Sequence, residues 1–424
     1  MITKPKGTYD VNGDYGKKLL YVENLFRAVM EKYNYEYVRT PIFEASSLFH
    51  RGVGETSDIV SKETYDFKDR GNRDMTLRPE GTAGVVRSFL ENKMYGRDNK
   101  PVKTWYYGPM YRYERPQAGR CREFYQFGVE VFGSNSPILD AEVISIPVNL
   151  YRLLGLKGIK VKINTLGDYE SRQNYRNALL EYFKPYIKDL CSDCQVRYEK
   201  NPLRILDCKI DSHLDIMENA PKTIDYLNET SKQHFEEVQK YLDVLEIEYE
   251  IDSKVVRGLD YYTHTIFEVE ALVEGFGAQN VLCGGGRYDN LVNTLGDIDV
   301  PGVGFAMGME RLMTALDFEQ IQLVDSSIDL YIIPMGEEAL TYSVGLLEGI
   351  RMNGFKADMD YMSRNMKGNF KQADRLHSKF IAIIGDDEVK SKIITIKDNT
   401  NKEEFKIKEE DLILFLDEHI EEDK

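Results

Sequence analysis

The chain has 424 residues, 42% hydrophobic and 30% charged, so it is long enough for two or three domains and has the composition of a globular protein. Its net charge of −16 excludes nucleic-acid binding through bulk positive charge, although a local basic surface can still bind RNA. We expect a cytoplasmic protein without a membrane segment, because apolar runs and a signal peptide are lacking and the five cysteines are an odd number.

The first predicted elements are a helix and an edge strand. Apolar side chains recur at helical spacing over residues 15–33, which predicts an amphipathic helix. The strand-like sequence YEYVRTPIFE follows and contains Pro41, which places it at a sheet edge or an interface.

The next stretch, TYDFKDRGNRDMTLRPEGT, predicts two short strands around a turn and then a helix from about Thr82 to Lys93. Glu80 lies at this strand-to-helix junction. Its carboxylate can simply be a charge partner of the helix N-terminus. It can also bind the ammonium group of a ligand, with the Thr82 hydroxyl as a second acceptor.

Residues 107–133, YGPMYRYERPQAGRCREFYQFGVEVFG, predict a β-hairpin with a long polar tip. Arg112 is expected inside the first strand, where a forked guanidinium suits capture of a phosphate or carboxylate. Glu130 is expected on the returning strand between two valines, so we predict that it is buried with a cationic or N–H partner. An edge hairpin with solvated charges explains each residue alone, but not the convergence of several donors and one acceptor.

From about residue 168 to residue 251 the sequence changes to charged helices, which predicts a helical insertion. It contains Cys191 and Cys194, within CSDC, and also Cys208. One C-x-x-C pair with a further cysteine is a weak zinc signal, and His213 is the extra ligand nearby. Reduced structural thiols are the simpler interpretation, so we assign no metal ligand and leave zinc open.

Strand-like sequence returns at VVRGLDYYTHTIFEVEAL, where Arg257 precedes Tyr261 and Tyr262. The sequence VLCGGGRYDNLV then predicts either a close backbone approach to a flat or anionic ligand or an ordinary turn or bulge. VPGVGFAMGMERLMTAL predicts a strand and a helix that carries Glu310 and Arg311.

Alternating strands and helices over residues 325–424 predict a small α/β domain with a mixed sheet. A helix expected over residues 364–379 carries five basic residues at spacings of three or four, which places all of them on one face. They are Arg364, Lys367, Lys371, Arg375 and Lys379. A basic row is most often a solvated face, but in an acidic domain binding of a phosphate backbone explains it better.

These strings resemble the histidyl-tRNA synthetases, a branch of the class II aminoacyl-tRNA synthetases. The first helix and strand are similar to motif 1, the dimer element, the hairpin to motif 2, and VPGVGFAMGMERLMTAL to motif 3. RGLDYYTHTIFE and CGGGRYDNL resemble the histidyl branch in particular. The resemblance implies an α+β fold, with a class II antiparallel-sheet catalytic domain over residues 1–324 that contains the helical insertion, and a C-terminal anticodon-binding domain over residues 325–424.

The activity that the resemblance implies is that of a histidine–tRNA ligase. ATP activates L-histidine to histidyl-adenylate, and the histidyl group then passes to the 3′ end of tRNA(His) with release of AMP. Fixed arginines and Mg²⁺ stabilise a charge-rich transition state of this kind, so ATP and Mg²⁺ are expected at the site. A second copy of the chain, forming a homodimer, is the further expected partner.

The resemblance also implies residue roles. Arg112 and Arg257 are expected to hold the α-phosphate from opposite sides, and Arg120 and Arg311 the phosphate tail of ATP. The residues expected to bind histidine are Glu80, Thr82, Gln126, Glu130, Tyr261, Tyr262 and Tyr288. Gln117, at the hairpin tip, is expected to touch the acceptor end of tRNA, and the basic row to contact tRNA as well.

Within the histidine set, Glu80 and Thr82 are expected to meet the amino group. Glu130 and the Tyr262 hydroxyl suit the two imidazole nitrogens, because a buried carboxylate left unpaired disfavours aliphatic amino acids. Lys6 stands where the family usually has arginine before Gly-Thr, which keeps the charge but loses the forked donor.

Two alternatives compete with this interpretation. One is the regulatory paralogue of bacterial histidine biosynthesis, which lacks the C-terminal domain and does not charge tRNA. The other is a catalytically inactive interaction module. The additional C-terminal domain argues against the first, and intact Arg112, Arg257 and Arg311 argue against the second.

Overall fold

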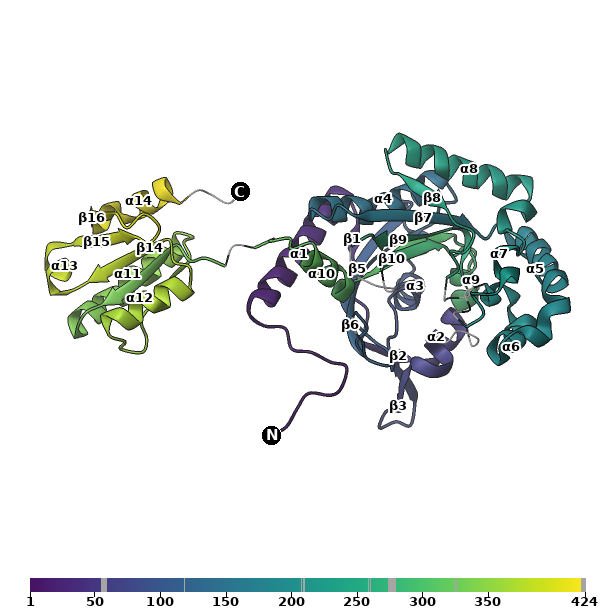
Figure 1. The fold of residues 1–424 in the computed structure, drawn as a ribbon, viewed down its shortest axis with the longest axis horizontal. Helices are drawn as coiled ribbons and strands as arrows, with labels where there is room; N and C mark the ends of the chain where they lie inside the picture. Colours follow the sequence, from purple (N-terminus) through teal and green to yellow (C-terminus); the bar gives the residue numbers. More distant parts are fainter. Residues whose placement is uncertain are drawn as a thin grey trace. The chain divides into compact units, whose positions relative to one another are not determined.

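The computed structural model describes residues 1–54, 59–117, 119–206, 208, 210–257, 259, 261–273, 280–324 and 326–420. They form two compact units (Figure 1). The first unit comprises residues 1–12 and 19–321, and the second comprises residues 13–18 and 322–424.

The first unit is built on an eight-stranded sheet with the order β1-β5-β6-β11-β10-β9-β7-β8. Its outermost pairs, β1–β5 and β7–β8, are parallel, and the pairs between them are antiparallel. The strands are β1 (Glu36–Tyr37), β5 (Val102–Tyr111), β6 (Glu123–Phe132), β7 (Ile159–Thr165), β8 (Tyr249–Ile251), β9 (Thr263–Ala271), β10 (Val281–Arg287) and β11 (Gly302–Gly308). This mainly antiparallel sheet agrees with the predicted catalytic fold.

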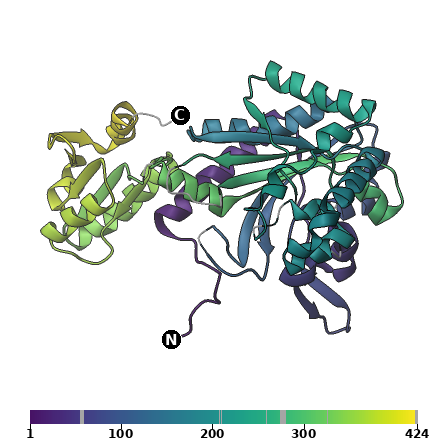
Figure 2. The ribbon, with the colours of Figure 1, turned by 45° about the vertical axis from the view of Figure 1, so that its right-hand side comes forward.

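One face of the sheet is covered by two helical layers. Helix α4 (Pro137–Leu153) packs on β9, β10 and β11, and α8 (Glu229–Val244) packs on α4. Figures 1 and 2 show both helices on the same side of the sheet. The sequence PILDAEVISIPVNLYRL of α4 is apolar around most of its circumference because the helix lies between the sheet and a second helix.

The N-terminal elements follow the predicted order. Helix α1 (Gly13–Lys32) is the predicted amphipathic helix, and it buries Val22, Phe26, Val29 and Met30. A small sheet of order β2-β4-β3 then leads into α3, which ends before the predicted Lys93. These elements are β2 (Phe43–Ala45), α2 (Ser46–Val53), β3 (Tyr65–Lys68), β4 (Asp74–Leu77) and α3 (Thr82–Glu91).

The predicted hairpin is present, with β5 and β6 paired from Val102↔Phe132 to Tyr111↔Glu123. Arg112 was predicted inside the first strand and instead lies directly after it. Its backbone N–H still donates to the Arg122 carbonyl at 3.0 Å, so the two chains continue side by side toward the tip.

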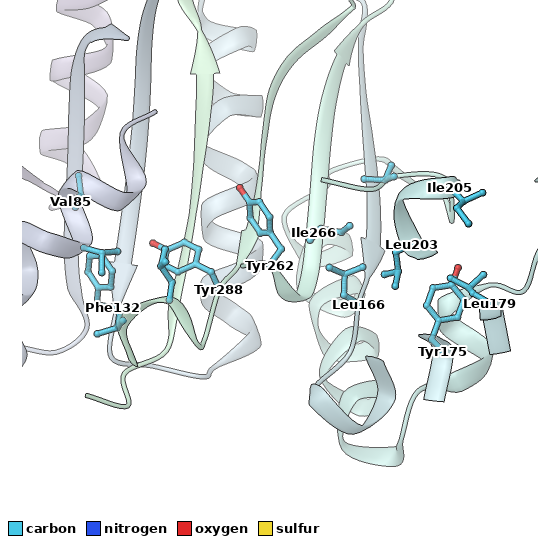
Figure 3. Packing of buried hydrophobic residues seen from close by; sticks show 14 of the residues in the cluster. Val85, Phe132, Leu166, Tyr175, Leu179, Leu203, Ile205, Tyr262, Ile266 and Tyr288 are labelled. Carbon is cyan, nitrogen blue, oxygen red and sulfur yellow. The ribbon is translucent and has the colours of Figure 1, made fainter. Parts of the chain in front are cut away.

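The insertion is mostly helical, and its last residues, β8, pair with β7 in the large sheet. Its helices are α5 (Tyr169–Phe183), α6 (Ser192–Lys200), α7 (Asp215–Glu218) and α8, with short 3-10 turns such as η4 (Pro202–Ile205). Figure 3 shows the apolar core running from Phe132 and Tyr288 past Tyr262 and Ile266 to Leu203 of the insertion. The insertion therefore shares its core with the sheet.

The strand predicted over residues 255–272 begins only at Thr263, in β9. The residues before it approach the sheet as irregular backbone, so Arg257 and Tyr261 reach the site from a loop.

The second unit is a five-stranded mixed sheet of order β13-β12-β14-β15-β16, as predicted. Alternate residues of β12 face opposite sides, with Leu330 and Ile332 in one apolar cluster and Tyr331 and Ile333 in another. The elements are β12 (Leu330–Pro334), α11 (Glu337–Met352), β13 (Ala357–Met359), α12 (Met366–Arg375), β14 (Phe380–Ile384), α13 (Asp386–Ser391), β15 (Ile393–Asp398), β16 (Glu404–Lys408) and α14 (Leu412–His419).

The helix predicted over residues 364–379 is shorter in the structure. Its N-cap is Asn365, whose side chain accepts from the Gly368 N–H at 2.9 Å, and His377 has a left-handed backbone with φ of 47°. Arg364 and Lys379 therefore lie outside α12, and the prediction of one helical face for all five basic residues is wrong.

Among the described residues, a helix long and apolar enough to cross a membrane is not found.

Candidate active site

A cavity of about 310 Å³ in the first unit lies at the hairpin, the start of α3 and strands β9 to β11. Nine of the residues predicted for the site line it. They are Glu80, Thr82, Arg112, Arg120, Gln126, Arg257, Tyr261, Tyr262 and Arg311. Glu130 and Tyr288 lie directly beneath, joined to this lining through Thr82.

Glu130 is buried on β6, with 1% of its surface exposed. One carboxylate oxygen accepts from the Thr82 hydroxyl at 2.7 Å, and the other accepts from the Tyr288 hydroxyl. The predicted burial is correct, but the predicted cationic or N–H partner is wrong, because hydroxyl groups fill that place. Burial raises the pKa of Glu130 to about 8, although both hydrogen bonds act in the opposite direction.

Glycine at position 304 makes room for this carboxylate. Gly304 faces Glu130 across the β6–β11 pair, and a Cβ there would collide with the carboxylate. The sheet is thus shaped around a buried acid that has no ion pair among the described residues. A buried acceptor of this kind suits a ligand that brings its own donor and positive charge.

Tyr106 lies beside the residues that position Glu80 and Glu130, and the sequence analysis did not single it out. Its ring lies between Gly81 and Gly128, where a Cβ on either glycine would collide with it. Its hydroxyl is buried, and none of the described residues forms a hydrogen bond with it. In the sequence, Tyr106 is one of several aromatic residues in the first strand of the hairpin. Sequence alone does not distinguish it from an aromatic residue of the hydrophobic core.

Glu80 has the capping role considered from the sequence, and its position at the cavity is the one that the ligand-binding role requires. Its two carboxylate oxygens accept from the backbone N–H groups of Thr82 and Ala83, each at 2.8 Å, so it caps α3. It also lines the cavity. Burial raises the pKa of Glu80, while the two N–H donors and the nearby Arg112 favour its charged form.

Arg257 lies across the cavity from the hairpin and donates to Glu268 of β9 at 2.5 Å. A Cβ at Gly284 would collide with the guanidinium of Arg257. The glycine run was predicted to permit close approach of a ligand, and in the structure it permits close approach of this side chain. Burial lowers the pKa of Arg257, but the Glu268 carboxylate outweighs it and raises the pKa above its ordinary value. The sequence analysis did not identify Glu268, although it lies within RGLDYYTHTIFE.

Three arginines, Arg112, Arg120 and Arg311, line the cavity, and two of them approach Glu114. Arg120 approaches Glu114 at 3.3 Å and Arg112 approaches it at 3.8 Å. Arg311 donates to the Val281 carbonyl at 2.9 Å, and burial together with the charge of Arg120 lowers its pKa. Positive charge presented on several forked donors suits a polyphosphate.

Aromatic and amide groups complete the wall between the two charged ends. The rings of Tyr261 and Tyr262 lie 4.7 Å apart, and those of Tyr261 and Tyr288 lie 5.7 Å apart. The side-chain oxygen of Gln126 is buried without a hydrogen-bond partner. An unpaired buried acceptor beside a cavity indicates a donor on the ligand.

The N-terminal segment packs against the hairpin tip. The Arg122 N–H donates to the Gly7 carbonyl at 2.7 Å, and Tyr9 donates to Glu310, another cavity residue without an assigned role in the sequence analysis. Lys6 is exposed. Gln117 is also exposed, and its backbone exchanges two hydrogen bonds with that of Arg120 in a tight turn.

The basic row on the second unit is reduced to three residues of α12. Lys367, Lys371 and Arg375 are exposed at spacings of four, opposite the buried Ala373. Arg364 instead pairs with Asp360 at 2.6 Å, and Lys379 approaches Asp329 at 3.8 Å.

Comparison with known proteins adds an independent finding. The sequence matches the profile of the family described as histidyl-tRNA synthetase over residues 7–312, and that of the anticodon binding domain over residues 329–419. A histidine–tRNA ligase of Anoxybacillus flavithermus is 53% identical over 394 residues, 93% of each chain. One of Geobacillus sp. is 52% identical over 98% of this chain and 99% of its own. The crystal structure of apo S. aureus histidyl-tRNA synthetase has a TM-score of 0.84 and 44% identity, covering 98% of this chain and 100% of that one.

Proposed function

The chain belongs to the histidyl-tRNA synthetase family, and we infer from this that it is an ATP-dependent histidine–tRNA ligase. The α+β fold with a class II catalytic sheet and a C-terminal anticodon-binding domain, predicted from the sequence, is confirmed. The relatives match over nearly the whole chain, including the C-terminal domain that the regulatory paralogue lacks.

We propose that Glu130 recognises the imidazole ring of histidine. The observation that carries this proposal is the burial of Glu130 with hydroxyl partners only, among the described residues. One imidazole N–H would donate to Glu130, and the Tyr262 hydroxyl would meet the other nitrogen. With its raised pKa, Glu130 holds a proton near neutral pH that it can share with the imidazole. An aliphatic side chain offers no donor in return and would leave the acid unpaired, which is costly.

The histidine backbone would lie toward α3. Glu80 and Thr82 would accept from the ammonium group, and Gln126 can accept from it as well, since its unpaired oxygen lines the same cavity. This places the histidine carboxylate near the two arginines assigned to the α-phosphate. The carboxylate oxygen attacks the α-phosphorus, a P–O bond to pyrophosphate breaks, and histidyl-adenylate forms.

Arg257 and Arg112 would act as fixed charges on opposite sides of the reacting phosphate. Both guanidiniums are held in place before the ligand arrives, Arg257 by Glu268 and Arg112 by the Pro79 carbonyl at 2.8 Å. Preorganised donors stabilise developing charge without the cost of reorientation. Arg120 and Arg311 would hold the leaving pyrophosphate.

Mg²⁺ would enter with ATP as a neutralising ion. Glu310 lines the cavity at the start of α10 (Met309–Phe318), and one of its oxygens accepts from Tyr9 and from the Tyr125 N–H. Its second oxygen suits a hard cation, which prefers carboxylate and water ligands. Bound there, Mg²⁺ would supply positive charge to the phosphate oxygens.

We propose that the second step delivers the histidyl group to the 3′-terminal adenosine hydroxyl of tRNA(His). Residues 1–324 would carry both chemical steps, and residues 325–424 would bind the anticodon region. Gln117 at the exposed tip and the α12 row would contact tRNA, while Arg364 and Lys379 would do so only after leaving their acidic partners. The reaction would take place in the cytoplasm, where reducing conditions keep thiols free, as all five cysteines are here.

We also propose a homodimer. Large apolar side chains are exposed on α1, β1 and the start of β2, the region that resembles motif 1, and on the nearby β3. They are Leu20, Tyr21, Tyr37, Ile42, Phe43 and Phe67, each more than 40% exposed. Exposed apolar side chains gathered in one region of the chain indicate a protein interface.

Aminoacylation tests the function directly. Purified chain, ATP, Mg²⁺ and labelled histidine should give acid-precipitable histidyl-tRNA with tRNA(His). Transcripts of other tRNAs serve as controls. Failure to charge tRNA(His), from a folded chain that does form histidyl-adenylate, would reject the second step alone.

A further inference from the structure

The three cysteines left open by the sequence analysis come together in the insertion. The thiols of Cys191, Cys194 and Cys208 and a carboxylate oxygen of Asp211 all lie within 4.8 Å of one another. The Sγ atoms of Cys191 and Cys208 are 3.7 Å apart. Thiolates at the corners of a tetrahedron around zinc are separated by about 3.8 Å, given Zn–S bonds of about 2.3 Å.

Asp211 completes a second short ligand pair. Cys191 and Cys194 are separated by two residues at the start of α6, and Cys208 and Asp211 are separated by two residues after η4. Two such pairs are the usual arrangement of a zinc site. The second pair was not recognised in the sequence, because the cysteine count does not include its aspartate. His213, the ligand considered from the sequence, is exposed, and its Nδ1 lies 2.8 Å from the Ile210 carbonyl.

Burial of three of the four donors favours a cation at this position. Cys194 is fully buried, and Cys208 and Asp211 are 5% and 4% exposed. They lie in the apolar core of the unit, and Asp211 has no ion pair among the residues that the structure describes. A buried carboxylate in apolar surroundings is strongly disfavoured unless a cation or metal accompanies it.

Backbone groups already support the four donors as a set. The Asp211 N–H donates to Sγ of Cys208 at 3.4 Å, and the Cys191 N–H donates to the Asp211 carboxylate. Cys191 is the N-cap of α6, so its thiol lies where the helix begins. Such contacts orient metal ligands before the metal binds.

We propose that Cys191, Cys194, Cys208 and Asp211 bind one structural zinc ion that ties the start of α6 to the turn after η4. Three sulfur donors select zinc over magnesium or calcium, and four protein ligands close the site to substrate. The described lining of the candidate active-site cavity includes none of the four donors, so this site is independent of the proposed ligase chemistry.

Metal analysis of the purified full-length chain tests the proposal. We expect about one zinc per chain by plasma mass spectrometry, with loss of zinc in Cys194→Ser and full retention in the control Cys121→Ser. Chelation should lower the thermal midpoint, and added Zn²⁺ should restore it. Replacement by Co²⁺ should give thiolate charge-transfer absorption and the visible bands of tetrahedral cobalt.

Asp211→Asn keeps the shape of the side chain and covers the case in which Cys194→Ser fails to fold. It should weaken zinc retention at least tenfold in a chelator competition. Wild-type chain that folds without metal and takes up none from added Zn²⁺ would overturn the proposal. A Cys191–Cys208 disulfide in its place, or iron in place of zinc, would also overturn it.

Discussion

At the scale of single residues, the site is organised by two groups of opposite charge, of which Glu130 is buried and Arg257 is half-buried. Glu130 has hydroxyl partners and a raised pKa, whereas Arg257 has the carboxylate of Glu268 and keeps its charge. The first is therefore a proton-sharing acceptor and the second a permanent cation. That division matches the two tasks of the proposed reaction, which are recognition of a weak base and stabilisation of a phosphate.

The raised pKa of Glu130 makes stability depend on pH in a defined direction. Its pKa is about 8 in the folded chain and 4.5 when unfolded, so between these values the folded state binds the extra proton. Its contribution to the free energy of unfolding is complete below pH 4.5 and falls as the pH rises toward 8, by about 5 kcal/mol in total.

Glu130→Gln cannot titrate, so its stability relative to wild type should increase between pH 5.5 and pH 8. Urea unfolding followed at Trp105, the single tryptophan, measures this in the strand next to β6. The exposed Glu236→Gln on α8 is the matched control and should show no such trend. An equal difference from wild type at both pH values would show that Glu130 is ionised throughout.

Arg257→Ala should lower the rate of histidyl-adenylate formation by about 10²–10³-fold, because one fixed donor to the α-phosphate is lost. The dissociation constant for histidine, measured without ATP, should change little. Because the substitution also leaves Glu268 without its partner, Arg257→Ala with Glu268→Gln serves as the control. Recovery of the rate in the double variant would mean that Arg257 only neutralises Glu268.

How far the sequence predicted the site depends on the kind of contact. Residues recognised by their own chemistry in a string, such as Glu80, Arg112 and Glu130, were identified. Glu268 and Tyr106 were not, since their contacts are with residues distant along the sheet or on a loop, which the local sequence does not specify. For the same reason, the prediction of a cationic or N–H partner for Glu130 was wrong, and two hydroxyl groups are its partners in the structure.

At the scale of elements, periodicity found most helices and strands but set some ends wrongly. The regular spacing of basic residues over 364–379 continues past both ends of α12, so the prediction followed it and set the helix ends too far apart. Asn365 caps the helix, and the Asp360 carboxylate accepts from the Arg364 N–H at 2.6 Å, which holds that residue outside it. The strand predicted to include Arg257 begins only at Thr263. The aromatic residues Tyr261 and Tyr262 suggested a strand, but they precede it and line the cavity.

The shortened row on α12 gives a sharper prediction for tRNA binding. Lys371→Glu with Arg375→Glu should raise the KM for tRNA about tenfold or more, because two phosphate contacts become repulsive. Adenylate formation should not change. Lys390→Glu with Lys406→Glu alters two exposed lysines elsewhere on the same unit by the same total charge and should have a smaller effect. Equal effects of the two pairs would mean that α12 is a solvated face.

At the scale of the whole molecule, the exposed apolar side chains near motif 1 are the feature that a single chain leaves unexplained. Phe43 and Phe67 of the small sheet are 53% and 42% exposed, with their rings 6.3 Å apart. We expect light scattering to give twice the mass of one chain. Phe43→Asp should shift the chain toward monomer, and Val244→Asp, at an exposed position on α8, should not. A wild-type monomer with full activity at micromolar concentration would contradict the dimer.

The most direct measurement is ATP–pyrophosphate exchange with each of the twenty amino acids in the absence of tRNA. It isolates the first chemical step and the amino-acid specificity assigned to Glu130 and Tyr262. Exchange with histidine, and with none of the others at comparable rates, is the expected result. A folded chain that exchanges with no amino acid, or equally with an aliphatic one, would contradict the proposed function of the cavity.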